Sequence, residues 1–196
     1  AYVYYNIGQT YQQLKRYEDA REYYVKGTEV SARCSDCFVK LGYIESLLQN
    51  YDLAESYIKD AILSNEANPM PYLYLGNIYN NKKEFSSAIE QYSLALKKAN
   101  TFKAITSSQY NQILIALGDI YSNIKEPHRG LIFYKKAYEL FPNNLENLVG
   151  LLRLKRELCD WEDYNQLTQQ LILASNIENN KKKIINNQLI GLLTPY

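Results

Sequence analysis

The chain has 196 residues and a formal net charge of +1, and its 46% hydrophobic and 22% charged residues are typical of a globular protein. Because 22 basic and 21 acidic side chains are interspersed, no basic face is predicted and we expect no nucleic-acid partner. No apolar run approaches the roughly 20 residues of a membrane span and no signal-peptide pattern opens the chain, so we expect no membrane partner and a cytoplasmic or nuclear location.

A spacing of 34 residues runs through the first three quarters of the sequence. Four glycines that each follow a large aliphatic residue are separated by 34, 34 and 42 residues: Gly8, Gly42, Gly76 and Gly118. Two further rows of small residues keep the same separations: Ala20, Ala54, Ala88 and Gly130, then Gly27, Ala61, Ala95 and Ala137. Self-similarity at a fixed period predicts a repeat architecture, in which each repeat covers its neighbour.

Each repeat has the pattern of two helices. Counting from the first residue of a repeat, apolar residues at positions 4, 7, 8 and 11 form one helical stripe, and those at positions 20, 24 and 27 form a second. The small residues of the three rows are expected where the helices approach most closely, because packing at about 8 to 10 Å leaves no room for a large side chain.

This pattern resembles the tetratricopeptide repeat family from about residue 1 to residue 144. The resemblance implies an all-α fold, a right-handed superhelical solenoid of antiparallel helix pairs with a concave and a convex side. We predict repeats 1 to 4 at residues 1–34, 35–68, 69–102 and 111–144, a degenerate repeat 5 at residues 145–178, and a linker or helix over residues 179–196. Because 42 exceeds 34 by eight residues, we also predict longer helices before repeat 4, with helical backbone over most of residues 86–104.

Repeat 5 departs from the pattern. Leu152 stands where glycine is expected and Tyr164 where alanine is expected, so we predict that its two helices are splayed. Trp161, the sole tryptophan, occupies position 17, which holds an aromatic residue in the first three repeats. We therefore expect Trp161 to begin the second helix and to pack inward with Tyr164, and Asp160 to cap that helix.

A second resemblance lies in the stretch 159-CDWEDY-164 and the residues that follow it to Tyr196. The stretch is similar to the end of the repeat region in protein O-linked N-acetylglucosamine transferases, just before their catalytic domain. The resemblance implies a substrate-recognition arm without catalytic residues or cofactor of its own, with UDP-N-acetylglucosamine as donor for a catalytic domain that follows in cis. We expect residues 158–196 to be a joint in which Leu189, Leu192 and Leu193 are left for that domain. The alternative is a non-enzymatic adaptor that assembles a protein complex.

The predicted ligand is a protein or peptide in the concave groove. Positions 2, 5, 9, 12 and 13 of each first helix should face it, and they are mostly amides and aromatic rings, which suit an extended peptide without strong charge selection. The candidate residues are Tyr5, Gln9, Gln12, Tyr43, Asn77, Asn80, Asn81, Asp119 and Asn123. A merely solvated groove is the alternative.

Family comparisons narrow the binding mode. The carboxylate clamp of chaperone-binding repeats is not expected, because Lys40 is the sole basic residue on the first helices of repeats 1, 2 and 3. The asparagine ladder of the resembled transferases, at position 6, is not carried over. Position 6 here holds Asn6, Lys40, Tyr74, Ala116 and Gly150.

Cys34 and Cys37 have the C-x-x-C spacing of a zinc knuckle or a redox motif. No second such pair and no histidine pair completes four metal ligands, so we expect no metal site. With Cys159, the chain's three cysteines cannot form a disulfide framework, and such sparse thiols favour a reducing compartment.

Overall fold

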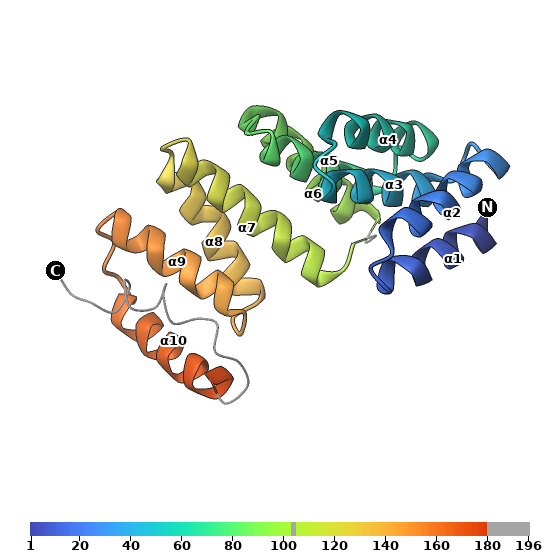
Figure 1. The fold of residues 1–196 in the computed structure, drawn as a ribbon. Helices are drawn as coiled ribbons and strands as arrows, with labels where there is room; N and C mark the ends of the chain where they lie inside the picture. Colours follow the sequence, from blue (N-terminus) through green and yellow to red (C-terminus); the bar gives the residue numbers. More distant parts are fainter. Residues whose placement is uncertain (103–104, 180–196) are drawn as a thin grey trace. The chain divides into compact units, whose positions relative to one another are not determined.

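The computed structural model describes residues 1–102 and 105–179, and within them the chain forms ten α-helices and no β-strand (Figure 1). The helices are α1 (Tyr2–Gln13), α2 (Tyr17–Val30), α3 (Ser35–Leu47), α4 (Tyr51–Ser64), α5 (Pro69–Asn81), α6 (Phe85–Phe102), α7 (Ser107–Asn123), α8 (Pro127–Leu140), α9 (Leu145–Glu157) and α10 (Tyr164–Asn179). The all-α prediction is therefore confirmed. Among the described residues, no helix combines the length and apolar character needed to cross a membrane.

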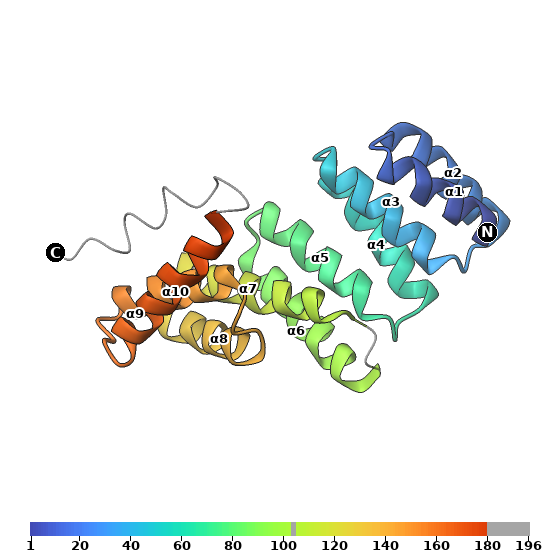
Figure 2. The same ribbon diagram turned by 90° about the horizontal axis from the view of Figure 1, so that it is seen from below.

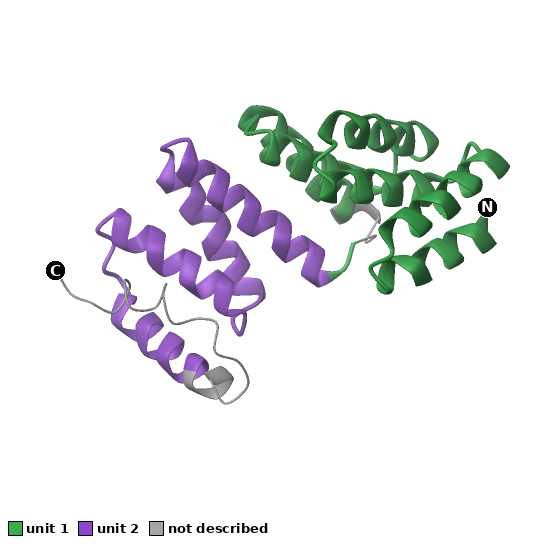
Figure 3. Cartoon of the chain, in the orientation of Figure 1, with its two compact units in different colours: residues 1–106 green, residues 107–196 purple. Residues whose placement is uncertain are grey.

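The chain divides into two compact units (Figure 3). Unit 1, residues 1–106, contains α1 to α6, and unit 2, which begins at residue 107, contains α7 to α10. Within each unit, consecutive helices pair as hairpins, and in unit 1 the first helices of repeats 2 and 3, α3 and α5, lie side by side (Figures 1 and 2). Residues 180–196 of the predicted joint, with Leu189, Leu192 and Leu193, lie outside the described residues.

The eight additional residues between repeats 3 and 4 lengthen the helices. Helix α6 has 18 residues where α2 and α4 have 14, and α7 has 17 where α3 and α5 have 13. The predicted helical backbone is thus confirmed from residue 86 to residue 102, whereas residues 103–104 lie outside the described part of the chain.

The glycines at position 8 lie against the residue at position 24 of the same repeat. A Cβ atom added to Gly8, Gly76 or Gly118 would lie 2.6 Å from a ring carbon of Tyr24, Tyr92 or Tyr134, respectively. These three tyrosines are almost fully buried, each with 2% exposure or less. Helix pairs in repeats 1, 3 and 4 therefore close around a tyrosine ring that replaces the missing glycine side chain.

A left-handed residue ends the first helix of every repeat. Position 15 has φ between 54° and 64° in all five repeats, at Lys15, Gln49, Lys83, Lys125 and Cys159. In repeat 3, the N–H groups of Lys83 and Glu84 donate to the carbonyls of Asn80 and Tyr79, at 3.0 and 2.9 Å. This is the Schellman pattern, which satisfies the last carbonyls of a helix and turns the chain into the next one.

The predicted start of the last helix is wrong. Helix α10 begins at Tyr164, after a left-handed Asp163, and not at Trp161. The Asp160 carboxylate accepts hydrogen bonds from Lys155 Nζ, at 2.8 Å, and from the N–H of Glu162, at 3.2 Å, so it closes a turn and caps no helix at residue 161. These bonds hold residues 160–163 out of the helix.

The prediction that Trp161 packs inward is also wrong, because its side chain is 57% exposed. The Tyr164 ring contacts Trp161 edge-on, with centroids 5.2 Å apart, and packs against the leucine core of unit 2, as expected for Tyr164. Fewer close backbone contacts form between α9 and α10 than within the other helix pairs, as Leu152 and Tyr164 led us to expect.

Two buried charges replace the tyrosines that repeats 1, 3 and 4 carry at position 11. Glu45 is 1% exposed and forms an ion pair with Arg21 Nε of α2, at 2.6 Å, while its second oxygen accepts from Asn50. Lys155, 3% exposed, pairs with Asp160. Each buried charge has an opposite partner, as the cost of desolvation requires.

We predict that Gly76→Ala destabilises the chain, although alanine normally stabilises a helix interior relative to glycine by about 0.5–1 kcal/mol. The added Cβ would overlap the Tyr92 ring, so the free energy of unfolding in urea should fall by about 1–3 kcal/mol. In a Tyr92→Leu background the same substitution should cost less. An increase in stability on the wild-type background would contradict the described packing.

Candidate functional site

A cavity of about 260 Å³ opens between α3 and α5 in unit 1. Four of the candidate residues line it, namely Tyr43 on α3 and Asn77, Asn80 and Asn81 on α5. The other lining residues are Gly42, Ser46, Leu47, Tyr74 and Ile78. All nine are uncharged, so the structure brings together an aromatic and amide surface of the kind predicted for the groove.

A hydrogen bond from the core holds the Asn77 amide in place. Its Oδ1 atom accepts a hydrogen bond of 2.6 Å from the buried Tyr92 hydroxyl, which orients the NH₂ group away from that contact. Burial raises the pKa of Tyr92, which keeps this hydroxyl a donor. Asn80 and Asn81 make no side-chain hydrogen bond to other residues in the described part of the chain, so their amides are available to a ligand.

Tyr43 and Tyr74 form the aromatic wall of the cavity. Their rings meet edge to face, with centroids 5.7 Å apart. Burial raises the pKa of Tyr74, and the hydroxyls of Tyr43 and Tyr5 raise it further, but Tyr5 of α1 does not line the cavity. We name the surface formed by Tyr43, Tyr74, Asn77, Asn80 and Asn81 the aromatic–amide groove.

The remaining candidates on α1 are committed to internal hydrogen bonds. Gln9 Nε2 donates to the Tyr5 hydroxyl at 2.9 Å, and Gln12 Oε1 accepts from the Tyr24 hydroxyl at 2.9 Å. Neither glutamine lines the cavity. They orient the tyrosines of repeat 1 and each keeps one amide group for other contacts.

Asp119 and Asn123 belong to unit 2. Asp119 accepts a hydrogen bond from the Tyr134 hydroxyl at 2.8 Å and forms an ion pair with Arg153 at 2.5 Å. Burial, followed by the Asp119 charge, raises the pKa of Tyr134. Asn123 is exposed at the end of α7. Asp119 is thus paired with Tyr134 and Arg153, while its side chain remains 43% exposed.

Sequence reasoning missed Tyr74, which lines the cavity but was not among the candidate residues. Tyr74 stands at position 6, where the resembled transferases carry asparagine. That difference is the sequence signal that could have pointed to Tyr74. The Lys40 side chain is partly buried, and burial lowers its pKa while the Asp36 charge opposes that shift. Neither Asp36 nor Lys40 lines the cavity, whose lining residues are all uncharged.

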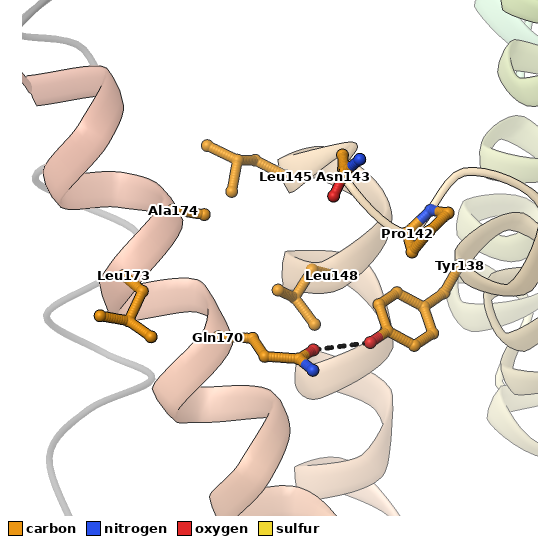
Figure 4. Close-up of a pocket in the computed structure, with 8 residues that line it drawn as sticks. All are labelled: Tyr138, Pro142, Asn143, Leu145, Leu148, Gln170, Leu173 and Ala174. Carbon is orange, nitrogen blue, oxygen red and sulfur yellow. Dashed lines mark hydrogen bonds between the residues drawn. The ribbon is translucent and has the colours of Figure 1, made fainter.

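Unit 2 contains a larger cavity of about 500 Å³ among α8, α9 and α10 (Figure 4). Its lining residues are Tyr138, Pro142, Asn143, Leu145, Leu148, Gln170, Leu173 and Ala174. The Tyr138 hydroxyl donates to Gln170 Oε1 at 2.6 Å across it. The walls are mainly apolar and contain none of the candidate groove residues.

Cys34 and Cys37 are joined by a disulfide, which the sequence analysis did not predict. Two cysteines three residues apart at the start of a helix lie on one face, which brings their sulfur atoms together. Cys159 is free and exposed. Within the described residues, no three His, Cys, Asp or Glu side chains are grouped as a metal site.

The repeated helix pairs have the tetratricopeptide fold that the sequence predicts. In agreement, residues 1–31 match the tetratricopeptide repeat family. Residues 34–150 match the family described as "Uncharacterized protein conserved in bacteria (DUF2225)". This second match covers more than half of the 196 residues, so the chain belongs to that family.

Solved structures share the fold at low sequence identity. Pseudomonas aeruginosa PilF is 16% identical, with a TM-score of 0.77 over 88% of this chain and 75% of that one. A structure of MamA is 14% identical, with a TM-score of 0.74 over 89% of this chain and 97% of the other. MamA from residue 41 to its end, from Desulfovibrio magneticus RS-1, is 15% identical, with a TM-score of 0.71 over 92% and 96%. These similarities establish the tetratricopeptide fold.

A charged cluster holds α4 against α5, behind the groove. Glu55 accepts from Lys59, Lys82 and the Tyr79 hydroxyl, at 2.8, 3.1 and 2.9 Å. Burial by itself raises the pKa of Glu55, but the hydrogen bonds from these three donors lower it to about 2. The carboxylate thus links the two repeats that form the groove.

We predict an acid-sensitive stability from Glu55. Its pKa is depressed in the folded chain relative to 4.5, so its contribution is complete above about pH 5 and is lost as the pH falls toward about 2. Urea titrations at several pH values should show this loss. Glu55→Gln should lower stability at neutral pH and reduce the further loss of stability at acidic pH, which is the acid limb of the pH profile. Glu29→Gln, at an exposed position of α2, is the matched control. Equal acid limbs in wild type and Glu55→Gln would contradict the assigned role.

Proposed function

We propose that this chain is a non-enzymatic adaptor that holds an extended, uncharged segment of a partner protein in the aromatic–amide groove. The observation that carries the proposal is the cavity in which Tyr43 and Tyr74 face Asn77, Asn80 and Asn81. The tetratricopeptide fold supports a protein-interaction role, and repeats 2 and 3 supply the groove that such a role requires.

The groove chemistry suits a peptide backbone. An extended segment presents alternating N–H and C=O groups at every residue, and primary amides can both donate to and accept from such groups. Asn80 and Asn81 are neighbours at the end of α5, and Asn77 lies one turn before them with its Oδ1 already occupied. Asn77, Asn80 and Asn81 therefore share one face of α5, from which their amides can bind peptide groups of an extended segment.

The two tyrosine rings favour an apolar or aromatic side chain on the bound segment. The lining includes Leu47 and Ile78 beside Tyr43 and Tyr74, and the volume of about 260 Å³ accommodates one large side chain rather than several. Because no lining residue is charged, we expect little discrimination between acidic and basic segments beyond the cavity.

We predict that Asn77→Ala together with Asn80→Ala weakens peptide binding by about tenfold, because each lost hydrogen bond contributes about 0.5–1.5 kcal/mol. Peptides selected from a displayed random library against the full chain would be measured by calorimetry. Affinity should change little between about 0.1 M and 1 M salt, since few charges line the path.

Asn143→Ala is the matched control for this experiment. Asn143 is an exposed asparagine of unit 2, outside the groove, so its replacement should leave affinity unchanged. Unchanged binding by the Asn77 and Asn80 double variant, with helicity intact, would place the peptide site elsewhere. Loss of binding in Asn143→Ala would point to the apolar cavity of unit 2.

A second candidate is the substrate-recognition arm of a protein O-linked N-acetylglucosamine transferase. It rests on the resemblance of residues 158–196 and on the exposed Trp161 ring, which is available to a following domain. The families and structures compared above include no glycosyltransferase, which favours the adaptor. The full-length protein incubated with labelled UDP-N-acetylglucosamine and mixed protein acceptors distinguishes the two, and a folded protein that transfers no sugar leaves the adaptor.

A further inference from the structure

We propose that Cys34 and Cys37 form a thiol–disulfide exchange site, in which Cys34 reacts with a partner disulfide or thiol and Cys37 resolves the mixed disulfide. The proposal is independent of peptide binding in the groove. It rests on the disulfide itself, on the position of both cysteines at the start of α3, and on the difference in burial between the two residues.

The two cysteines occupy the first turn of a helix. Cys34 is the N-cap residue of α3, where it makes no side-chain capping bond, and Cys37 is the third helical residue. The unpaired N–H groups and the dipole at a helix N-terminus stabilise an anionic sulfur, which is the reactive form in exchange. Asp36 lies between the cysteines and its charge opposes this effect, but its side chain is exposed and interacts with Tyr5 and Lys40.

Burial separates the roles of the two sulfur atoms. Cys34 is partly exposed in the turn between α2 and α3, within reach of another molecule. Cys37 is fully buried and packs against α2, where a Cβ atom added to Gly27 would lie 2.7 Å from Cys37 Sγ. A bulky disulfide partner can therefore reach Cys34 but not Cys37.

The exchange is balanced in two steps. In the reduced chain, the Cys34 thiolate attacks one sulfur of a partner disulfide, a new S–S bond forms, and the first partner thiolate leaves and takes a proton from water. The Cys37 thiolate then attacks Cys34 Sγ, the Cys34–Cys37 bond forms, and the second partner thiolate leaves. The chain loses two electrons and two protons, and the partner disulfide gains them.

Cys159 provides an internal reference, because it is an exposed free cysteine without a second cysteine in its turn. The full chain would be reduced, freed of reductant and treated with oxidised glutathione, and then quenched with acid and mapped by mass spectrometry. In wild type, we expect glutathione to remain on Cys159, while Cys34 and Cys37 form their intramolecular disulfide and retain none.

The single variants test each role. In Cys37→Ser, and in Cys37→Ala as a second variant that buries no new hydroxyl, glutathione should remain on Cys34. In Cys34→Ser, Cys37 should be modified at least about tenfold more slowly than Cys159, because access controls the reaction. Circular dichroism confirms that each variant is folded.

Two results would overturn the proposal. One is glutathione retained on Cys34 of the wild type to the same extent as on Cys159, which would show that Cys37 does not resolve the mixed disulfide. The other is modification of Cys37 in Cys34→Ser as fast as that of Cys159, which would remove the division of roles.

Discussion

The contact between the glycine at position 8 and the tyrosine at position 24 determines both the packing of the repeats and the chemistry of the groove. Because the glycine has no side chain, the ring from the second helix lies directly on the backbone of the first. In repeats 3 and 4 the hydroxyl then reaches the residue at position 9, Asn77 or Asp119, at 2.6 and 2.8 Å. A buried aromatic ring thus orients a polar side chain on the surface of the helix pair. The packing of the core therefore also determines the geometry of the site.

Repeat 2 shows what happens when that contact changes. Ile58 replaces tyrosine at position 24, fills the space above Gly42 and has no hydroxyl to offer. Position 9 holds Tyr43, whose ring packs edge to face against Tyr74. Tyr43 receives no hydrogen bond from position 24, because Ile58 has no hydroxyl. The cavity therefore lies between a repeat whose position-9 residue is an aromatic ring and one whose position-9 residue is an oriented amide. This combination gives one groove both a side-chain pocket and backbone hydrogen-bonding groups.

The sequence predicted what depends on local periodicity. The rows of glycine and alanine located the helix pairs, and the 42-residue spacing predicted the longer α6 and α7, because an insertion in phase with two helical turns can extend existing helices. Four groove residues were also identified from their positions. Trp161 was misplaced because the turn at residues 160–163 depends on a bond from the buried Lys155 to Asp160, a tertiary contact that position 17 of the repeat does not encode. Tyr74 was missed because its role arises from the ring of a neighbouring repeat.

Helix α3 is held in place by contacts that lie outside the groove. Its buried Glu45 pairs with Arg21 of α2, its Ser35 hydroxyl donates to the Ala61 carbonyl of α4 at 3.0 Å, and its first turn carries the disulfide. On the other side of the groove, Lys82 ties the end of α5 to Asp52 and Glu55 of α4. The helices that carry Tyr43 and the α5 asparagines are thus fixed by contacts outside the groove. Since ordering of side chains and loops is a large part of the cost of association, a surface ordered by folding can bind a short neutral segment with few contacts. Most of the conformational entropy lost on binding is then lost by the partner segment. Segments already extended in their free state lose less, so they are favoured.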